Sequence, residues 1–473
     1  MEEAEFPLWY PVELLQALDL SPLSKAVFPT VTGVSIDTRT LQPGDLFIAL
    51  KGDVQDGHAY VQQAFEKGAS VALVDAAHLD ALPSNLPKDK MLSVDDTLNA
   101  LWALGRAGRS RSKGNIVAVT GSVGKTTFKE SLGTLLASRF STHVSPLSYN
   151  NHWGVPLSLA RMPRETAYGV FELGMNRPGE ITNLTELVQP HVALITTIAP
   201  AHRAFFPSLE AIAEAKAEIF KGLTLDGVAI LPYDHFLFNL LAEQAAIYTD
   251  TILTFGTQTG AGVRCVSQPQ GNLTRFSVHL PNQPVVELDL ALPGQIWTQM
   301  VGALAAVLVS LKLNLQDFEQ AFKTLRPIKG RGSIHSFSLK QKNLTLIDES
   351  YNANPASMQA ALETFGSQSI GGGKKVVVLG DMAELGDLEL AYHLQLEPIL
   401  QAQGIDKVFA CGPLMGELFQ QLPQHQKGQW APTAKELLAP LKDVLEEGDA
   451  VLIKASNSMG LGALVASLLA ENS

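Results

Sequence analysis

A glycine-bearing stretch followed by a lysine and two threonines carries the strongest chemical signal in the chain. Residues 116–127 read IVAVTGSVGKTT: a β-branched apolar run, a break at glycine, and then a helix predicted from Phe128 to about Ser138. Such a junction presents backbone N–H groups and a helix dipole to a phosphate, a lysine to neutralise it, and a hydroxyl that can hold Mg²⁺. The strict phosphate-loop pattern has a glycine where this chain has Val119, so the predicted site is a variant. Its nucleotide-binding residues would be Gly121, Ser122, Val123, Gly124, Lys125, Thr126 and Thr127.

A carboxylate, a histidine and a lysine downstream are of the types that bind metal ions or react. Glu172 ends an apolar predicted strand, where a buried carboxylate is costly unless a cation or metal ion partners it. His202 begins the loop after the next strand, a place where a lone histidine is more often an ordinary surface residue. Lys216 lies on the inward stripe of a helix predicted over residues 208–223. It is either a snorkelling lysine or a partner of Glu172, or else a buried amine whose lowered pKa lets it react.

Polar clusters also end three strands predicted in the C-terminal part of the chain. They are residues 348–355 (DESYNANP), 380–386 (GDMAELG) and 454–457 (KASN). Loop chemistry and helix capping, for example by Asn354 before a helix beginning at Ser357, would explain each cluster alone. Three clusters at one edge of a sheet are better explained by a ligand cleft.

A smaller cluster near the N-terminus combines hydroxyl, carboxylate and guanidinium groups. Ser35, Asp37 and Arg39 lie at the end of a strand predicted over residues 31–37. A local pair between Asp37 and Arg39 and the binding of a ligand explain this cluster equally well.

The elements that must position these residues alternate between strand and helix over most of the chain. This alternation predicts parallel sheets covered by helices, with ligands at the carboxyl ends of the strands. Between Tyr248 and Leu290 the pattern changes to short alternating segments with Asn and Gly turns, which predict an antiparallel appendage. The strands predicted outside that region are residues 31–37, 45–50, 70–74, 117–120, 169–173, 192–198, 227–231, 344–347, 375–379, 407–411 and 450–453.

Length and composition indicate several domains of a soluble α/β enzyme. A chain of 473 residues is too long for one core, and about three domains are expected. We predict a small N-terminal α/β domain (1–112), a central domain with a parallel sheet like that of P-loop ATPases (113–326) and a C-terminal Rossmann-like domain (327–473). The basic, glycine-bearing residues 105–114 and the Pro/Gly-rich residues 326–332 are the predicted linkers.

Charge and cysteine content exclude several classes of function. The net charge of −12 disfavours a nucleic-acid-binding surface. Cys265 and Cys411 fit no metal or disulfide spacing, which indicates a reduced cytoplasmic location. The acidic N-terminus is unlike a secretory signal, and no apolar run is long enough to span a bilayer. We expect a cytoplasmic monomer that acts on small molecules, without nucleic-acid or membrane partners.

Taken together, the motifs resemble the Mur ligase family, ATP-dependent enzymes that form amide bonds in bacterial cell-wall synthesis. Besides the phosphate loop and the clusters DESYNANP and GDMAELG, the resemblance includes residues 150–157 (NNHWGVPL), 171–176 (FELGMN) and 215–220 (AKAEIF). It spans all three predicted domains in order. Within the family, the motifs are most similar to those of the member that joins D-alanyl-D-alanine to UDP-N-acetylmuramoyl-tripeptide through an acyl phosphate. The resemblance therefore implies ATP and Mg²⁺ as cofactors and these two small molecules as substrates.

The resemblance also implies a role for each catalytic candidate. Lys125 would contact the β- and γ-phosphates of ATP, and Thr126 would contact Mg²⁺. Glu172 would bind Mg²⁺, His202 matches the family's metal-site histidine, and Lys216 matches the lysine that takes up CO₂ as a carbamate. An inward-facing Lys216 suits that chemistry, because only the neutral amine reacts and its product is an anionic oxygen ligand.

Substrate-binding residues follow from the same resemblance. Ser35, Asp37 and Arg39 would surround the uridine nucleotide, with Asn150 and Asn151 also on the substrate side. The residues that would face ATP from the third domain are Arg331, Asp348, Asn352 and Asn354, and those near the acceptor are Lys454 and Ser456.

Four places depart from the family pattern. Residues 295–300 (QIWTQM) stand where histidine and asparagine usually help to hold the nucleotide, and residues 454–457 read KASN in place of Lys-Gly-Ser with a nearby arginine. Residues 202–206 replace a His-Leu-Glu type of loop, and Arg177 stands where histidine is frequent. The first departure is expected to affect the affinity for ATP, and the second is expected to affect the affinity for the peptide substrate. The phosphate loop and the metal-binding set are intact, so catalysis is still expected.

Two other classes of function compete with this interpretation. A sister ligase that adds a single amino acid, or a folylpolyglutamate-type ligase, would use the same scaffold, although the combination of the two C-terminal motifs argues against both. A non-catalytic, ATP-binding scaffold protein would explain the four departures. Such a protein would bind ATP but release no phosphate with the full set of substrates.

Overall fold

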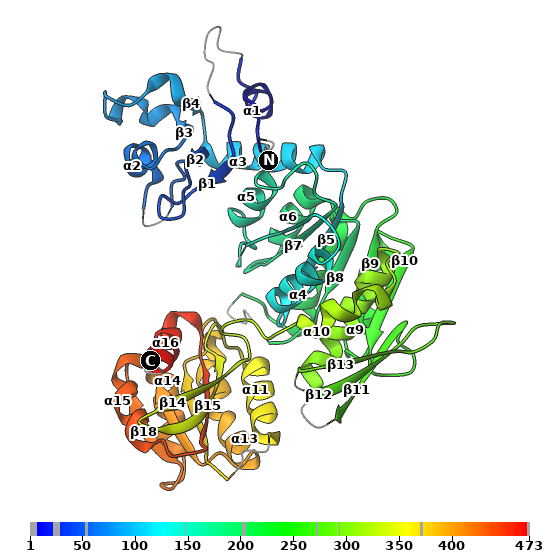
Figure 1. The fold of residues 1–473 in the computed structure, drawn as a ribbon, viewed down its shortest axis with the longest axis vertical. Coiled ribbons are helices and arrows are strands. Elements are labelled where there is room, and N and C mark those ends of the chain that lie inside the picture. The colour runs from blue at the N-terminus through cyan, green and yellow to red at the C-terminus, as the bar shows by residue number, and fades with distance from the viewer. Residues whose placement is uncertain are drawn as a thin grey trace.

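In the computed structural model, three separate β-sheets divide the chain into three successive units (Figure 1). The structure describes residues 7–21, 29–52, 55–146, 148–200, 205–270, 273–292, 294–368 and 372–470, without the side chains of residues 294–296. Each sheet falls within one of the three ranges predicted for the domains, whose boundaries stay a prediction. Within these described ranges, no helix is both long and apolar enough to cross a membrane.

The first unit is a four-stranded parallel sheet in the order β1-β2-β3-β4. Apart from one terminal aspartate in each, its interior strands β2 and β3 are apolar, and all or nearly all of their residues are buried, as expected for a parallel sheet covered on both faces. Three of its strands were predicted; β4 was not. Its elements are α1 (Pro11–Ala17), β1 (Gly33–Ser35), β2 (Asp45–Ile48), α2 (Val61–Glu66), β3 (Val71–Asp75), β4 (Met91–Val94) and α3 (Thr97–Arg111).

The second unit is built on a nine-stranded sheet in the order β13-β12-β11-β10-β9-β8-β5-β7-β6. Strand β5, which leads into the phosphate loop, lies between β7 and β8 and is parallel to both. The strands are β5 (Asn115–Thr120), β6 (Thr142–Val144), β7 (Tyr168–Glu172), β8 (Val192–Ile195), β9 (Val228–Pro232), β10 (Thr251–Gly256), β11 (Val263–Gln270), β12 (Leu273–His279) and β13 (Val286–Leu290). The helices are α4 (Lys125–Ala137), α5 (Gly154–Ala160), α6 (Glu180–Val188), α7 (Leu209–Ala217), α8 (Phe238–Ala246), α9 (Gly294–Ser310) and α10 (Glu319–Thr324).

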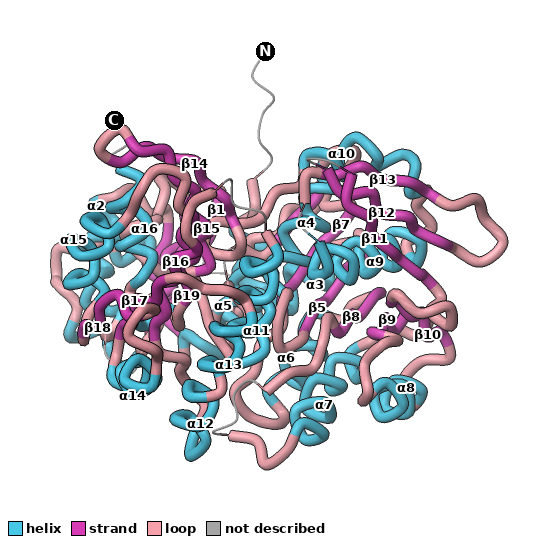
Figure 2. Tube along the Cα trace, turned by 90° about the horizontal axis from the view of Figure 1, so that it is seen from below, coloured by secondary structure: helices cyan, strands magenta, loops and turns pink. Residues whose placement is uncertain are grey.

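Two apolar clusters cover the two faces of this central sheet. Val117 and Val119 of β5 pack into the cluster that contains α4 and α9, whereas Ile116 and Ala118 pack into the one that contains α5 to α8. Figure 2 shows α4 and α9 on one side of β5 and β8, and α6 and α7 on the other. This alternation fixes the strand tightly, so the loop that follows β5 has a rigid base.

The region predicted as an antiparallel appendage, residues 248–290, is part of this sheet. Strand β10 is parallel to β9 and to β11, and only β11, β12 and β13 pair in antiparallel fashion. The predicted antiparallel pairing is therefore confirmed for β11 to β13 and wrong for β10, because short alternating segments do not reveal that the first of them continues the parallel sheet. Helix α9 packs against this extension and closes the core.

Helix α3 corrects the linker predicted at residues 105–114. The helix continues through that stretch as far as Arg111. A Cβ on Gly108 would lie 2.3 Å from Leu159 O, so the glycine lets α3 approach the backbone of α5 closely. Arg109 Nε donates a hydrogen bond to Val188 O at 2.7 Å. The glycines and arginines that suggested a linker therefore dock the first unit on the second.

The third unit is a six-stranded sheet in the order β14-β15-β19-β16-β17-β18. All pairings are parallel except that of β14 with β15, and helices cover both faces, as predicted for a Rossmann-like unit. The strands are β14 (Ser333–Leu339), β15 (Lys342–Glu349), β16 (Lys375–Gly380), β17 (Lys407–Cys411), β18 (Lys427–Ala431) and β19 (Ala450–Lys454). The helices are α11 (Pro355–Ser367), α12 (Glu389–Leu394), α13 (Leu396–Ala402), α14 (Pro413–Gln421), α15 (Ala434–Val444) and α16 (Leu461–Ala470).

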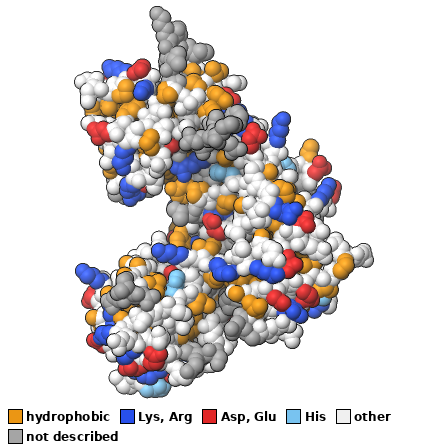
Figure 3. Space-filling view, viewed as in Figure 1, with side chains coloured by type: hydrophobic (Ala, Val, Ile, Leu, Met, Phe, Trp, Pro, Cys, Tyr) orange, Lys and Arg blue, Asp and Glu red, His pale blue; other side chains and the backbone are white. Residues whose placement is uncertain are grey.

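The polar clusters of the third unit follow β15, β16 and β19, which are adjacent in this sheet. Their carboxyl ends therefore meet at one edge, as predicted. The space-filling view shows a deep indentation between the first and third units, with the second unit at its base (Figure 3). The predicted fold class is confirmed: an α/β chain of three units around a central, largely parallel sheet.

Candidate active site

The phosphate loop takes a course that only glycine can follow at two positions. Gly121 has φ +148°, and a Cβ there would lie 1.9 Å from Thr196 Oγ1. Gly124 has φ +85° directly before α4 begins at Lys125. Because L-residues rarely adopt positive φ, these glycines let the chain turn from β5 into the helix.

The loop is braced by residues that follow β8. Thr196 Oγ1 donates a hydrogen bond to Val123 O at 2.6 Å. Ser122 Oγ donates to Ala199 O at 3.0 Å and accepts from Ala199 N at 2.9 Å. These bonds connect the loop to the neighbouring strand end, so it is held in place before any phosphate binds.

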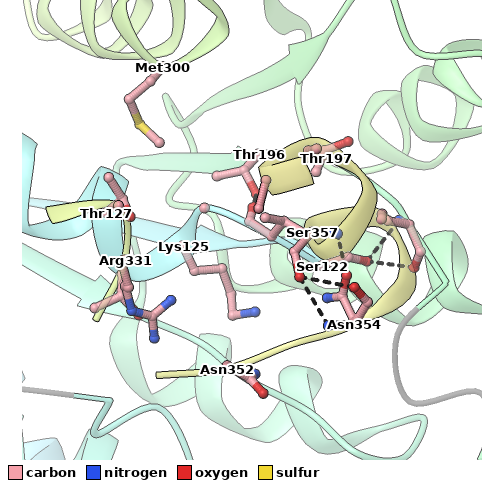
Figure 4. Close-up of a pocket in the computed structure, with 18 of the residues that line it drawn as sticks. Ser122, Lys125, Thr127, Thr196, Thr197, Met300, Arg331, Asn352, Asn354 and Ser357 are labelled. Carbon is pink, nitrogen blue, oxygen red and sulfur yellow. Dashed lines mark hydrogen bonds between the residues drawn. The ribbon is translucent and has the colours of Figure 1, made fainter. Parts of the chain in front are cut away.

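Lys125 is enclosed in the cleft and points across its own loop. Its Nζ donates to Gly121 O at 2.6 Å. Burial lowers the pKa of Lys125, Glu172 opposes that shift, and the positive charge of Arg331 adds to it. Figure 4 shows Lys125 and Arg331 beside each other, although they come from different units. Two cations this close favour an anion such as a phosphate between them.

Glu172 is a buried carboxylate surrounded by groups that donate hydrogen bonds. It is 1% exposed; Thr126 Oγ1 donates to Oε2 at 2.7 Å and Asn150 Nδ2 donates to Oε1 at 2.8 Å. Among the residues described, no lysine or arginine forms an ion pair with it. A carboxylate and a hydroxyl are hard oxygen ligands, and a buried carboxylate without a paired cation calls for one. The donor set of Thr126 and Glu172 therefore fits Mg²⁺.

Lys216 lies in the last turn of helix α7 and is 1% exposed. The predicted helix over residues 208–223 in fact changes to a 3₁₀ turn at Glu218. The pKa of Lys216 lies well below its usual value because of burial and the nearby charge of Lys125, with Glu172 opposing. The structure describes no ion pair between Lys216 and Glu172, so the predicted pair is not formed there. Burial and the neighbouring Lys125 thus favour the neutral form of its amine, which is the form that the reactive alternative requires.

His202, the predicted metal-site histidine, lies outside the described residues. Its place relative to Glu172 and Lys216 therefore stays a prediction.

The third unit faces the phosphate loop with several of the predicted residues. Arg331, Asn352, Asn354 and Lys454 all line the cleft. Lys454 Nζ donates to Glu349 Oε2 at 3.2 Å and to Asn352 O at 3.1 Å. Asn354 is also the N-cap of α11, because its Oδ1 accepts from Ser357 N at 2.9 Å. In Figure 4, Arg331, Asn352 and Asn354 lie along the side of the cleft opposite Thr196 and Met300.

Among the predicted site residues that do not line this cleft, three have side chains that hold backbone instead. Asp348 is 1% exposed and accepts from Gly330 N at 3.0 Å. Ser456 Oγ accepts from Ala383 N, and Asn151 Oδ1 accepts from Gly154 N at the start of α5. These side chains fix the loops that carry the cleft residues.

The predicted uridine-side cluster lies in the first unit, away from the phosphate loop. Asp37 accepts bonds from the guanidinium of Arg39, with the shortest at 2.6 Å, so the local pair considered from sequence is present. The side chain of Arg39 is 87% exposed. Ser35 is buried and donates to Asp37 O. The pair holds the loop in shape and leaves most of the guanidinium accessible.

Several cleft residues were missed in the sequence. Thr196 follows an apolar strand end and could have been found from that position, as Glu172 was. Ser148 Oγ lies 2.7 Å from Tyr351 OH, although 203 residues separate the two, and no sequence signal connects them. Asp234 and Gln299 line another wall and bond to each other at 3.0 Å.

The cleft between the second and third units has a volume of about 750 Å³. One end carries the phosphate loop, and Glu172 and Lys216 lie beside it. Such a volume admits a nucleotide together with part of a second substrate. The arrangement can hold polyphosphate and a carboxylate next to each other, which is the requirement for transferring a phosphoryl group to an acid.

A second polar cluster, made by Asp56, His58 and His78 in the first unit, has the residue types of a metal site. His58 Nδ1 lies 2.6 Å from Asp56 Oδ1, and His58 Nε2 accepts from Asp75 N at 2.9 Å. Both ring nitrogens of this buried histidine are therefore used by the protein. The cluster joins two segments of the first unit, residues 56–58 and 75–78, and leaves His58 no free nitrogen for a metal ion.

Comparison with protein families gives three matches in chain order. The model described as the catalytic domain of the Mur ligase family matches residues 30–108. The Mur ligase middle domain matches residues 119–310, and the Mur ligase glutamate ligase domain matches residues 330–457.

Two curated relatives carry the same name. The UDP-N-acetylmuramoyl-tripeptide–D-alanyl-D-alanine ligase of Bacillus subtilis (strain 168) is 35% identical over 443 residues, which cover 93% of this chain and 93% of that protein. The enzyme of the same name from Escherichia coli (strain K12) is 35% identical over 389 residues, which cover 81% and 82%.

Solved structures show the same similarity. The crystal structure of MurF from Acinetobacter baumannii superimposes with a TM-score of 0.83 at 30% identity, covering 99% of this chain and 100% of that one. MurF ligase from Thermotoga maritima in complex with ADP gives a TM-score of 0.77 at 25% identity, covering 93% and 97%. A folylpolyglutamate synthase from Yersinia pestis, at 17% identity and a TM-score of 0.57, shares the fold only.

Proposed function

The chain belongs to the Mur ligase family, and from this we infer that it joins D-alanyl-D-alanine to UDP-N-acetylmuramoyl-tripeptide in an ATP-dependent reaction. It is a carboxylate–amine ligase of peptidoglycan synthesis, and its product is the UDP-muramoyl-pentapeptide. The observation that carries this conclusion is the cleft. It gathers Lys125, Glu172 and Lys216 around one place and faces them with Arg331 from the third unit.

The reaction has two steps that this cleft suits. The free carboxylate of the tripeptide attacks the γ-phosphorus of ATP, which gives an acyl phosphate and ADP. The amine of D-alanyl-D-alanine then attacks the acyl carbon, and phosphate leaves through a tetrahedral intermediate. The first step brings two anions together, so it needs cations on both sides of them.

The chain's own residues supply that charge and alignment. Lys125 and Arg331 would approach the phosphates from the second and third units, and the backbone N–H groups of the first turn of α4 would cradle them. Asn352 and Asn354 would face the nucleotide, whereas Asp348 positions the segment around Gly330. Water would be excluded where the two units meet.

The residues that would hold Mg²⁺ are Thr126, Glu172, His202 and a carbamylated Lys216. When bound, the ion would neutralise charge on the phosphates and polarise the γ-phosphoryl group. Support for the proposal comes from the hydroxyl and carboxylate oxygens of Thr126 and Glu172, which lie 2.7 Å apart in a buried setting.

We propose that Lys216 reacts with CO₂ to form a carbamate. Its neutral amine is the form that attacks CO₂, and the anionic product would ease the repulsion that Lys125 exerts at this position. Incubation with ¹³C-bicarbonate should give a carbamate resonance in the NMR spectrum of the wild type that is absent from Lys216→Ala. The same resonance in the variant, or none in either protein, would contradict the proposal.

The remaining substrate contacts are proposals as well. Asn150, next to Glu172, would position the tripeptide carboxylate, and Asn151 would fix the loop that carries it. Ser35, Asp37 and Arg39 would bind the uridine nucleotide, for which the exposed guanidinium is suited to phosphate. Lys454 would face the acceptor dipeptide, with Ser456 holding the loop behind it. We also propose that the enzyme is a cytoplasmic monomer.

A phosphate-release assay with a panel of acceptors tests the function. Purified protein with ATP, Mg²⁺ and UDP-N-acetylmuramoyl-tripeptide should release phosphate when D-alanyl-D-alanine is added. Single amino acids, including glutamate, should stimulate far less phosphate release. Strong stimulation by a single amino acid would indicate a sister ligase, and ATP binding without any phosphate release would indicate a non-catalytic protein.

A further inference from the structure

Tyr351 connects the nucleotide side of the cleft to the substrate side. It follows β15 in the third unit, and its phenol oxygen lies 2.7 Å from Ser148 Oγ in the second. Ser148 belongs to the loop between β6 and α5, two residues before Asn150. A hydroxyl–hydroxyl bond of this length joins the two units directly across the cleft.

On the nucleotide side, Tyr351 supports Arg331. The guanidinium carbon of Arg331 lies 4.2 Å from the centre of the Tyr351 ring. Tyr351 N also donates to Gly330 O at 3.1 Å, and a Cβ on Gly330 would lie 2.9 Å from Tyr351 Cβ. The tyrosine is thus packed tightly against the segment that carries the arginine, and stacking fixes the plane of the guanidinium.

On the substrate side, Ser148 leads to the carboxylate that fits Mg²⁺. Asn150 N donates to Ser148 O at 2.8 Å, and Asn150 Nδ2 donates to Glu172 Oε1 at 2.8 Å. A continuous set of contacts therefore runs from Arg331 through Tyr351 and Ser148 to Glu172.

We propose that Tyr351 is a positioning residue, whose hydroxyl bond to Ser148 aligns Arg331 with the phosphate loop when the second and third units are in contact. This inference rests on the proposed ligase function. Arg331 would touch the phosphates, and Tyr351 acts through it. Because charge shifts towards the leaving phosphate oxygen while the γ-phosphoryl group is transferred, correct placement of the guanidinium matters more for turnover than for binding.

A double-mutant cycle tests the link. Tyr351→Phe keeps the ring beneath Arg331 but removes the hydroxyl, and Ser148→Ala removes its partner. Each change should lower kcat by about 3- to 10-fold, the factor expected for one hydrogen bond, with a smaller change in the KM for ATP. The double variant should be no slower than either single variant. Ser148→Thr, which keeps a hydroxyl, should recover most of the loss.

Tyr248→Phe serves as the matched control, since this tyrosine lies after α8 and does not line the cleft. It should have the kcat of the wild type. Additive effects of Tyr351→Phe and Ser148→Ala, or an unchanged kcat in Tyr351→Phe, would overturn the proposal.

A measurement that needs no turnover separates this inference from the proposed function. Hydrogen–deuterium exchange of the ligand-free protein should be faster in residues 148–151 and 328–332 of Tyr351→Phe than in the wild type or Tyr248→Phe. Unchanged exchange in both segments would overturn the link even if no ligase activity were found. Wild-type protein without acceptor-dependent phosphate release would instead contradict the proposed function.

Discussion

Lys125 lies at a site where both burial and the neighbouring Arg331 oppose its positive charge. Desolvation and Arg331 both lower its pKa, and Lys125 in turn lowers the pKa of Lys216. Lys125 and Arg331 face one carboxylate, Glu172, which leaves a surplus of positive charge beside the phosphate loop. Polyphosphate would remove that surplus, so electrostatic complementarity at this point serves nucleotide binding and catalysis at the same time.

The first prediction concerns this lysine. Lys125→Ala should lower the turnover of phosphate release by at least about 10²–10³-fold, the usual loss for one electrostatic donor to the transition state. The circular dichroism spectrum and melting temperature should change little. Lys113→Ala, at an exposed position before β5, is the matched control and should retain activity. A loss smaller than about tenfold in Lys125→Ala would contradict the role assigned to it.

At the scale of single residues, the sequence identifies site candidates by their residue type and by their place at the end of a strand. Glu172 was predicted in this way, Thr126 from its place in the phosphate loop, and Asn150 only from the family resemblance; the three do lie together. Asp348 and Ser456 have the same features but bond to backbone N–H groups. The sequence cannot separate these cases, because a side chain that holds a loop and one that holds a ligand use the same atoms.

Helix α3 is the element on which the placement of the first unit depends. Its small residues and arginines read as a flexible linker, yet they make a close helix contact. Glycine without a Cβ allows backbone-to-backbone approach, and a pattern of single residues cannot show which partner it approaches. The extension of the central sheet by β10 was missed for a related reason, since strand pairing joins segments that are separate in sequence.

A substitution in α3 tests the close contact. Gly108→Ala would place a methyl group 2.3 Å from Leu159 O, so it should destabilise the protein by about 1–3 kcal/mol even though alanine favours helix. Chemical denaturation gives the free energy of unfolding. Ser110→Ala in the same helix is the control and should be neutral or slightly stabilising. Stabilisation by Gly108→Ala would show that α3 does not pack as described.

Strand β6 contains a histidine that makes stability depend on pH. Burial lowers the pKa of His143 to about 4, with the hydrogen bond to Ser158 opposing and Arg161 adding to the shift. An unfolded chain binds a proton at the ordinary histidine value near 6.5, so protonation favours unfolding between about pH 6.5 and pH 4. Stability should fall as pH decreases through this window, by up to about 3 kcal/mol, and this contribution should level off below it.

Replacement of that histidine tests the dependence. His143→Gln keeps a polar group near Ser158 without titrating, so its free energy of unfolding should fall less than that of the wild type between pH 6.5 and pH 4. The measurement is denaturant unfolding at a series of pH values. His425→Gln, at an exposed position, should follow the wild type. Parallel curves for His143→Gln and the wild type would contradict the assignment.

At the scale of the whole molecule, function arises where two units meet. The α/β class, the three units and the alternation of strand and helix followed from the sequence, because apolar periodicity and turn residues act locally. The cleft could not be predicted from the sequence, because it depends on how the third sheet faces the second and on contacts such as that of Ser148 with Tyr351. A wall made by Trp297 and Met300 stands where the family usually has polar residues, and the phosphate loop beside it is complete.

The most direct test of the account follows oxygen atoms through the reaction. The tripeptide is prepared with ¹⁸O in both oxygens of its free carboxylate and is incubated with ATP, Mg²⁺, D-alanyl-D-alanine and the protein. If the carboxylate attacks the γ-phosphorus, one labelled oxygen leaves with the phosphate and the other stays in the new amide. Mass spectrometry should therefore find one ¹⁸O in each phosphate released and one in the pentapeptide product. Unlabelled phosphate, or phosphate released without pentapeptide, would contradict the account.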